Sequence, residues 1–135
     1  MNILDELKKK GYKIEEDPGT YIELKNEKMK VKCSYLAKFN DRVLICIEFT
    51  SPKSISAVEG FLKSYARILG AVYAIISDGE EVKVLDIPSN TEIELKSIPL
   101  AEEAYKIRYK SKLDIEKRRV VACYSSIHCK CEVER

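Results

Sequence analysis

The sequence predicts an α/β fold, and two apolar runs with a helix between them carry that prediction. Residues 43–49 and 71–76 are nearly continuous β-branched and apolar runs, which indicates strands buried on both faces. Residues 56–69 lie between these runs and place apolar side chains on one helical face. A strand, a helix and a second strand in this order predict a right-handed crossover between two parallel strands.

The segments before this crossover predict one short helix and several short antiparallel strands. Residues 3–9 carry acidic side chains early and lysines late, as expected for a helix matched to its own dipole. Residues 12–24 contain two short strands on either side of the turn Asp17-Pro18-Gly19. Residues 29–39 alternate between apolar and polar side chains, and we expect them to form a central hairpin with residues 43–49.

The segments after the first crossover strand predict a capped helix, edge strands and a basic extension. Residues 56–59 fit a capping box that opens the crossover helix. Residues 82–87 and 91–95 follow turn sequences and predict antiparallel edge strands. Residues 101–127 have a helical pattern, and residues 105–119 hold seven Lys or Arg against two acids. This basic segment is either a solvated helix face or a surface that binds a DNA backbone. The salt dependence of DNA affinity would distinguish the two.

Length and composition bound the remaining possibilities. The chain of 135 residues, of which 45% are hydrophobic, suits a single domain over 1–135, with a core at about 3–96 and a C-terminal basic helical extension at about 100–128. The net charge of +2 does not by itself indicate a polyanion partner. No stretch approaches the roughly 18 apolar residues of a membrane span, so we expect no membrane partner and a cytoplasmic location. The absence of Gln and Trp, with many Lys and Glu, is typical of thermophilic proteins.

The order of these elements resembles the αβββαβ core of the restriction endonuclease-like, PD-(D/E)XK, nucleases. Within that superfamily the chain resembles the N-terminal domain of type I restriction enzyme R subunits, over about residues 3–128. The runs that carry the resemblance are Lys32-Cys33-Ser34-Tyr35-Leu36, Ile47-Glu48-Phe49-Thr50, Lys63 to Ala71, Ile75-Ile76-Ser77-Asp78-Gly79 and Glu116 to Ile127. The resemblance implies a mixed sheet with flanking helices and DNA as the partner.

The resemblance also implies where a catalytic centre would lie. In that family an Asp and a Glu on the two hairpin strands bind Mg²⁺, and a Lys two residues after the Glu lies beside the scissile phosphate. Here Ser34 stands at the Asp position, Glu48 at the Glu position and Thr50 at the Lys position. Because a carboxylate and a cation are missing, we expect only weak binding of Mg²⁺ at Glu48. The family's helix Gln is Phe61 in this chain.

The register of the central hairpin decides whether Ser34 and Glu48 share a face. A three-residue loop at 40–42 brings them to the same face, whereas a two-residue loop pairs Cys33 with Glu48. Glu48 has a second interpretation, as a strand-end carboxylate that pairs with Lys32, Lys53 or Arg42.

Other side chains are candidates to replace the missing groups. Lys53, Lys63 and Arg67 are candidates to supply positive charge and bind nucleic acid, and Asp41 or Glu23 to supply the second carboxylate. We expect a DNA-associated binding module with a degenerate centre and no cofactor. The alternative is an active Mg²⁺-dependent DNA endonuclease with relocated active-site residues. A protein partner, or a homodimer through edge strands, stays open.

Further motifs point to no other chemistry. The chain has no Gly-rich phosphate loop, and its one His lies in the tail, so NTPases and Ser-His-Asp hydrolases are excluded. Four side chains near the C-terminus are able to bind zinc, but their spacing matches no common zinc site, so we expect them to bind no metal; they are Cys123, His128, Cys129 and Cys131. Cys33 and Cys46 are expected to pack in the core.

Overall fold

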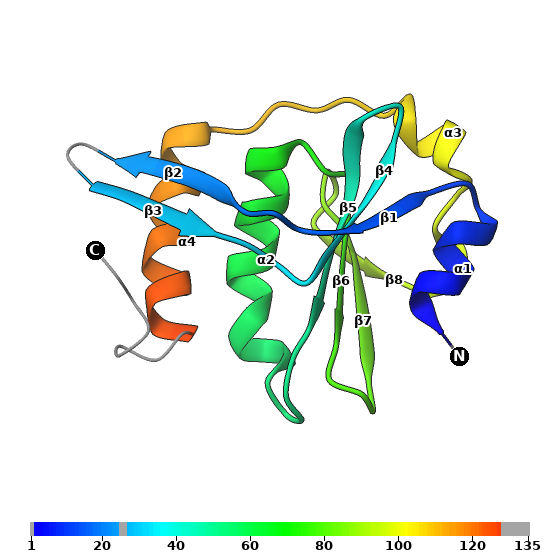
Figure 1. Ribbon diagram of the computed structural model, residues 1–135, viewed down its shortest axis with the longest axis horizontal. Helices are drawn as coiled ribbons and strands as arrows, with labels where there is room; N and C mark the ends of the chain where they lie inside the picture. The colour runs from blue at the N-terminus through cyan, green and yellow to red at the C-terminus, as the bar shows by residue number, and fades with distance from the viewer. Residues whose placement is uncertain (1, 25–26, 128–135) are drawn as a thin grey trace.

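The computed structural model describes residues 2–24 and 27–127, and it shows a mixed α/β fold with a central sheet and flanking helices (Figure 1). The strands are β1 (Lys13–Glu16), β2 (Thr20–Leu24), β3 (Glu27–Val31), β4 (Tyr35–Phe39), β5 (Arg42–Phe49), β6 (Tyr73–Ser77), β7 (Val82–Asp86) and β8 (Thr91–Ile93). The helices are α1 (Ile3–Lys9), α2 (Ile55–Leu69), the 3-10 turn η1 (Leu95–Ser97), α3 (Ala101–Tyr105) and α4 (Leu113–Ile127). No helix within the described residues is long and apolar enough to cross a bilayer.

The central sheet has six strands in the order β1-β4-β5-β6-β7-β8. Strands β5 and β6 are parallel and α2 connects them, which confirms the predicted crossover. The other neighbours in the sheet are antiparallel. Strand β7 lies between β6 and β8, so the prediction of two edge strands after the crossover is wrong for β7 and right for β8.

The predicted strand at 29–39 is two strands in the structure. Its first part, β3, pairs with β2 in a separate two-stranded ribbon, and its second part, β4, pairs with β5. The chain leaves the ribbon between them, where the Asp17 carboxylate accepts the Cys33 N–H at 2.9 Å. The alternation of side chains continues through this break, so sequence periodicity alone did not reveal it.

The hairpin of β4 and β5 contains a tight turn and a β-bulge. Asn40 and Asp41 form a two-residue turn and have φ angles of 49° and 63°, as the mirror-image hairpin turns require. Lys38 pairs with Val43 but Ala37 pairs with Ile45, so one residue of β5 has no partner in β4. Of the two loop lengths left open by the sequence, the two-residue loop is the one that forms. The bulge nevertheless shifts the register by one residue, and Tyr35 pairs with Ile47.

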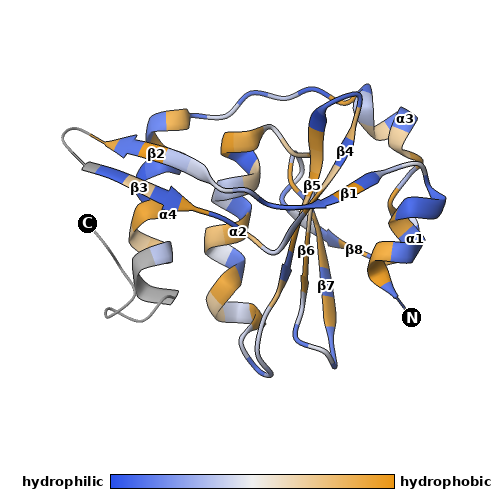
Figure 2. Cartoon of the chain, in the orientation of Figure 1, coloured by the Kyte–Doolittle hydropathy of each residue, from blue (hydrophilic) through white to orange (hydrophobic). Residues whose placement is uncertain are grey.

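Helices cover both faces of the sheet, and each face has its own apolar core. Helices α2 and α4 lie on one side and α1 and α3 on the other (Figure 1). Apolar residues concentrate in β5, β6 and β7 (Figure 2), as expected for strands with both faces covered. Helix α2 follows Ser54 and ends at Gly70, whose φ is 75°. The predicted capping box at 56–59 does not form, since the helix begins before it and Glu59 pairs with Lys63 and Lys83.

The basic extension is not one helix. Lys106 caps α3 with helical backbone angles, and residues 107–112 are neither helix nor strand between the short helix α3 and the longer α4, which corrects the prediction of a continuous helical pattern. The Arg42 guanidinium donates to the carbonyl oxygens of Tyr105 and Ile107 at 2.8 and 2.9 Å, and the Tyr109 hydroxyl donates to the Ala71 carbonyl. These contacts come from distant parts of the chain, and they hold the segment across the end of α2.

Candidate functional site

Ser34 and Glu48 lie side by side at the edge of the central hairpin. The Ser34 hydroxyl donates to Glu48 Oε1 at 2.6 Å, and the Phe49 N–H donates to Ser34 Oγ at 3.0 Å. Ser34 directly precedes β4 and Glu48 is the last but one residue of β5, so the register beyond the bulge brings the two together. The hydroxyl and the carboxylate therefore form one hydrogen-bonded pair at the two positions where the family resemblance expects two carboxylates.

A cavity of about 330 Å³ opens beside this pair. Its walls come from the end of β1, the segment that joins β3 to β4, the end of β5 and α4; they include Glu16, Asp17, Lys32, Cys33 and Tyr124. Three carboxylates, counting Glu48, outnumber the one ammonium group of Lys32. An excess of negative charge disfavours a phosphate group in this cavity.

Asp17 is a buried carboxylate, although its sequence predicted only a place in a turn. It accepts the N–H of Gly19 at 2.8 Å, the N–H of Cys33 at 2.9 Å and the hydroxyl of Tyr65 at 2.6 Å. Burial, followed by the hydrogen bond to Asp17, raises the pKa of the Tyr65 hydroxyl well above its usual value. The sequence showed the turn that contains Asp17, but it did not show the distant hydrogen-bond donors around this buried carboxylate. Through these hydrogen bonds Asp17 connects the residues just before β2, those just before β4 and the middle of α2.

Thr50 and Lys53 do not line this cavity. Thr50 follows β5, and its N–H donates to the Ser77 carbonyl at 2.8 Å. Lys53 is exposed in the loop before α2, where its φ is 66° and its N–H donates to Asp78 Oδ2 at 3.2 Å. The structure therefore brings no cation to Glu48 from either of these two predicted positions.

The predicted replacement carboxylates are also elsewhere. Asp41 is exposed in the turn at the opposite end of the β4–β5 hairpin, and Glu23 is exposed on β2, where its carboxylate lies 3.8 Å from Lys28 Nζ. Both suggestions are wrong for the geometry of this cavity. Phe61, at the position of the family's Gln, is buried and stacks on Tyr65 with 5.5 Å between ring centroids.

These residues do not fit the Mg²⁺ site that the resemblance implies. One Glu48 oxygen already accepts the Ser34 hydroxyl, and three donors are directed at the Asp17 carboxylate. Within 2–24 and 27–127, no three His, Cys, Asp or Glu side chains are grouped so that they could hold a metal ion. Of the four tail residues considered for zinc, Cys123 is half-buried on α4, and His128, Cys129 and Cys131 lie outside the described residues.

Cys33 and Cys46 are buried thiols near the candidate site, in agreement with the expectation of core packing. Cys33 Sγ donates to the Tyr35 carbonyl at 3.3 Å. A hydrogen bond with Cys46, followed by burial, raises the pKa of the Cys33 thiol well above its usual value. A thiol held in its protonated form is a poor nucleophile and a poor metal ligand.

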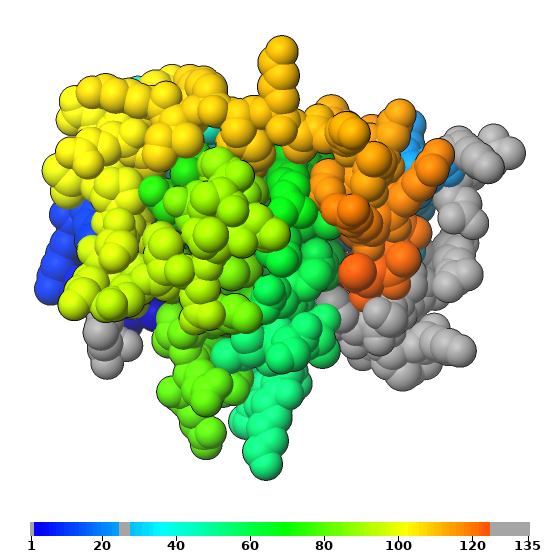
Figure 3. Space-filling view, turned by 180° about the vertical axis from the view of Figure 1, so that it is seen from behind, coloured from blue at the N-terminus to red at the C-terminus, as the bar shows by residue number. Residues whose placement is uncertain are grey.

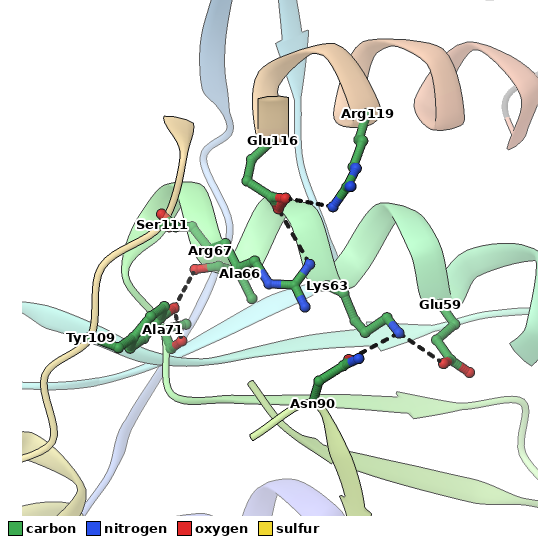
Figure 4. A network of polar contacts seen from close by, with 10 residues as sticks. All are labelled: Glu59, Lys63, Ala66, Arg67, Ala71, Asn90, Tyr109, Ser111, Glu116 and Arg119. Carbon is green, nitrogen blue, oxygen red and sulfur yellow. Dashed lines mark hydrogen bonds and ion pairs between the residues drawn. The ribbon is translucent and has the colours of Figure 1, made fainter. Parts of the chain in front are cut away.

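Lys63 and Arg67 lie on α2, where Lys63 points toward Asn90 in the turn between β7 and β8 and Arg67 points toward Glu116 on α4 (Figure 4). Lys63 Nζ donates to Asn90 Oδ1 at 3.2 Å and lies 3.5 Å from Glu59 Oε2. Arg67 is 3.3 Å from Glu116 Oε2. The two cations that we assigned to nucleic-acid binding therefore belong to a different surface from the Ser34–Glu48 pair.

Arg67, but not Lys63, lines a second cavity of about 420 Å³, which we call the basic groove. Its charged lining consists of Arg67, Lys110, Lys112, Arg119 and one acid, Glu116. Glu116 is only 4% exposed, and its two oxygens accept Arg67 and Arg119 at 3.3 and 3.0 Å. Four cations against one carboxylate leave a local excess of positive charge, although the whole chain is almost neutral.

Comparison with known proteins identifies a relative without a described activity. An uncharacterized protein from Archaeoglobus fulgidus is 33% identical over 117 residues, which cover 87% of this chain and 84% of the relative. No family model matches the chain, and no solved structure matches it.

Proposed function

We propose that this chain, which belongs to the same family as the Archaeoglobus fulgidus protein, is a DNA-binding module with a restriction endonuclease-like core and a degenerate catalytic centre. The order of elements supports this core. Helix α1, strands β1, β4 and β5, helix α2 and strand β6 follow the αβββαβ order, with the β2–β3 ribbon inserted after β1. The parallel pairing of β5 with β6 and the antiparallel pairing of β4 with β5 fit the same arrangement.

The Ser34–Glu48 pair supports loss of cleavage. A hydroxyl that donates to the carboxylate offers no negative charge to a divalent ion, and it occupies an oxygen that such an ion would need. Thr50 carries a hydroxyl where the family has a lysine ammonium group, and Lys53 does not line the cavity beside Glu48. Lys32 is the one cation in the lining of this cavity, and the three carboxylates there outweigh the positive charge that would stabilise a phosphate during hydrolysis.

The basic segment between α3 and α4 is the observation that carries the proposal. Along residues 106–112 the side chains alternate: Ile107, Tyr109 and Ser111 are half-buried, whereas Lys106, Arg108, Lys110 and Lys112 are exposed. The four cations therefore lie on the solvent side of the segment. The Arg108 guanidinium bends back and donates to the carbonyl oxygens of Tyr105 and Ile107, whereas Lys110 and Lys112 are exposed. Figure 3 shows this segment, coloured yellow to orange, along the upper edge of the face that is hidden in Figure 1.

The segment continues into the basic groove through Lys110 and Lys112. A set of cations on one side of a rigid support matches the repeating charge of a DNA backbone, because binding releases the counterions condensed on the phosphates. If the four cations of the segment each contact one phosphate, log K should fall against log salt with a slope of about −3.6. The contacts are with the backbone, so we expect little dependence on DNA sequence.

Salt-dependent binding of duplex DNA tests this proposal. The double variant Lys110→Ala/Lys112→Ala should weaken binding and reduce the salt slope by about one unit for each lost contact. The double variant Lys8→Ala/Lys9→Ala removes the same charge from α1 and is the matched control. Binding that does not depend on salt, or an equal loss in both variants, would refute the proposal.

Incubation of the wild-type chain and of Glu48→Ala with supercoiled DNA and Mg²⁺ or Mn²⁺ tests the degenerate centre. We expect no cleavage by either protein. Asp17 lies in the same cavity as Glu48, and this is the observation in favour of the alternative, an active endonuclease with relocated residues. Cleavage by the wild-type chain that is lost in Glu48→Ala would establish that alternative and remove the degenerate centre from the proposal.

A further inference from the structure

The β2–β3 ribbon has one buried face and one exposed face. Ile22 and Val31 are buried in the core that α2 also lines, and Met29 packs against that core. In Figure 1 the ribbon crosses in front of α2 and α4, so its other face is directed to solvent. That face carries Tyr21 and a series of lysines.

Tyr21 is the most exposed large hydrophobic side chain of the described residues, at 60%. Two ammonium groups lie over its ring in cation–π contacts: Lys28 Nζ is 4.6 Å and Lys30 Nζ 5.8 Å from the ring centroid. Lys30 is the register partner of Tyr21 on the neighbouring strand. An aromatic surface flanked by cations is chemically complementary to a nucleotide, which joins an aromatic base to an anionic phosphate.

The lysines form a row that leads to the candidate site. Lys28 and Lys30 alternate along β3, Lys32 follows directly after it, and all three side chains are exposed. Successive members are two residues apart, which is about 6.6–6.8 Å along a strand. Lys32 also lines the cavity that contains Glu48, so the row ends at that cavity. Glu23 balances part of this charge, since its carboxylate lies 3.8 Å from Lys28 Nζ.

Protection of a free strand edge does not account for this surface. Lysines on exposed strands do prevent unwanted pairing with other chains. This role of the lysines gives no role to the Tyr21 ring that lies among them.

We infer that the outer face of the ribbon, formed by Tyr21, Lys28, Lys30 and Lys32, binds single-stranded nucleic acid. One base stacks on the Tyr21 ring, and the lysines contact the phosphates on either side of it. The inference rests on the proposed DNA binding and names its preferred form. Single strands fit better than duplexes because their bases are free to stack on a protein side chain, whereas the bases of a duplex are stacked on each other.

The test compares three labelled ligands of equal length by fluorescence anisotropy: an oligothymidylate, an abasic single strand and a duplex. Tyr21→Ala should weaken binding of the oligothymidylate by about 5-fold or more. It should not change binding of the abasic strand or of the duplex, which offer no free base. Tyr21→Phe keeps an aromatic ring and should bind the oligothymidylate like the wild type.

Leu100→Ala is the matched control, because Leu100 is 54% exposed just before α3 and lies outside the ribbon. Thermal melting followed by circular dichroism should show that each variant is folded. An unchanged affinity of Tyr21→Ala for the oligothymidylate would overturn the inference, and so would an equal loss in Leu100→Ala.

The same measurements separate this inference from the proposed function. If Tyr21→Ala has no effect but Lys110→Ala/Lys112→Ala weakens duplex binding, the ribbon inference fails and the proposed function stands. If the wild-type chain binds none of the three ligands, both fail. If the abasic strand loses affinity as strongly as the oligothymidylate in Tyr21→Ala, the ring acts without base stacking and the inference is refuted.

Discussion

Replacement of Glu116 by Gln should lower the stability of the protein and raise its affinity for DNA. Glu116 is buried at the wall of the basic groove and accepts Arg67 and Arg119 through separate oxygens. Its carboxylate holds two guanidinium groups in place, but it also neutralises part of the charge that a phosphate would meet. Gln removes the negative charge and keeps one acceptor oxygen at nearly the same volume. The two effects therefore have opposite signs.

The size of each effect follows from these contacts. A hydrogen bond to a charged group contributes about 1.5–3 kcal/mol, and Gln loses one such bond. At about 4 °C for each kcal/mol, we expect Tm to fall by roughly 6–12 °C. A unit charge about 4 Å from a phosphate contributes about 1 kcal/mol in a medium like water. Removing this repulsion should tighten DNA binding by about 5-fold at low salt, since about 1.4 kcal/mol corresponds to a factor of ten.

The assay combines thermal melting with duplex binding at low and high salt. Glu15→Gln is the control. Glu15 lies on β1 and its carboxylate is 2.6 Å from Lys38 Nζ, and this variant changes the net charge by the same amount. Its effect on DNA affinity should be smaller, since β1 contributes nothing to the lining of the basic groove. An affinity of the Glu116 variant that is equal to or weaker than that of the folded wild type would show that DNA does not occupy the groove.

Three further predictions concern stability. Gly60→Ala should stabilise the chain by about 0.5–1 kcal/mol in urea unfolding, because the position is helical and the nearest atom to an added Cβ is Cys123 Sγ at 3.8 Å. Asp17→Asn should cost about 1–3 kcal/mol in the same assay, because three donors lose a charged acceptor. Burial raises the pKa of the Tyr65 and Tyr109 hydroxyls above the unfolded value of about 10. The free energy of unfolding should therefore keep its full value below about pH 10 and fall at higher pH, and tyrosinate absorbance should report the alkaline transition.

Each of these predictions has a control that differs in one respect. Gly70→Ala should destabilise, since Gly70 has a φ of 75°. Asp41→Asn, in an exposed turn, should leave the free energy of unfolding nearly unchanged. Tyr21→Phe removes an exposed hydroxyl and should not alter the alkaline transition. A stabilising Gly70 variant, a large loss in the Asp41 variant or a shift of that transition would contradict the respective argument.

Strong local periodicity predicted the parts of the fold that depend on local residues. The apolar runs of β5 and β6 and the amphipathic α2 were visible because each buries a regular pattern of side chains. The end of α2 was also predictable from a local residue, because Gly70 readily adopts the left-handed conformation that ends a helix.

Contacts between distant residues decided what the sequence pattern could not. Arg42 binds carbonyl groups more than sixty positions later in the chain and holds 107–112 out of a helix, although the local pattern favoured one. The candidate site shows the same limit. Asp17 was identified only as a turn residue, because its partner Tyr65 is 48 positions away. Lys63 and Arg67 were placed on the correct helix, but neither lines the cavity that contains Glu48.

The bulge in the β4–β5 hairpin decides whether paired residues are an odd or an even number of positions apart in the sequence. A regular hairpin with a two-residue turn pairs residues that are an odd number of positions apart, as Phe39 and Arg42 are. Ser34 and Glu48 are 14 positions apart, so they can meet only if one residue is left over between them. A three-residue turn or a two-residue turn with one bulge meets this condition equally well. The turn of this hairpin is therefore free to change its length, as long as the even separation between Ser34 and Glu48 is kept.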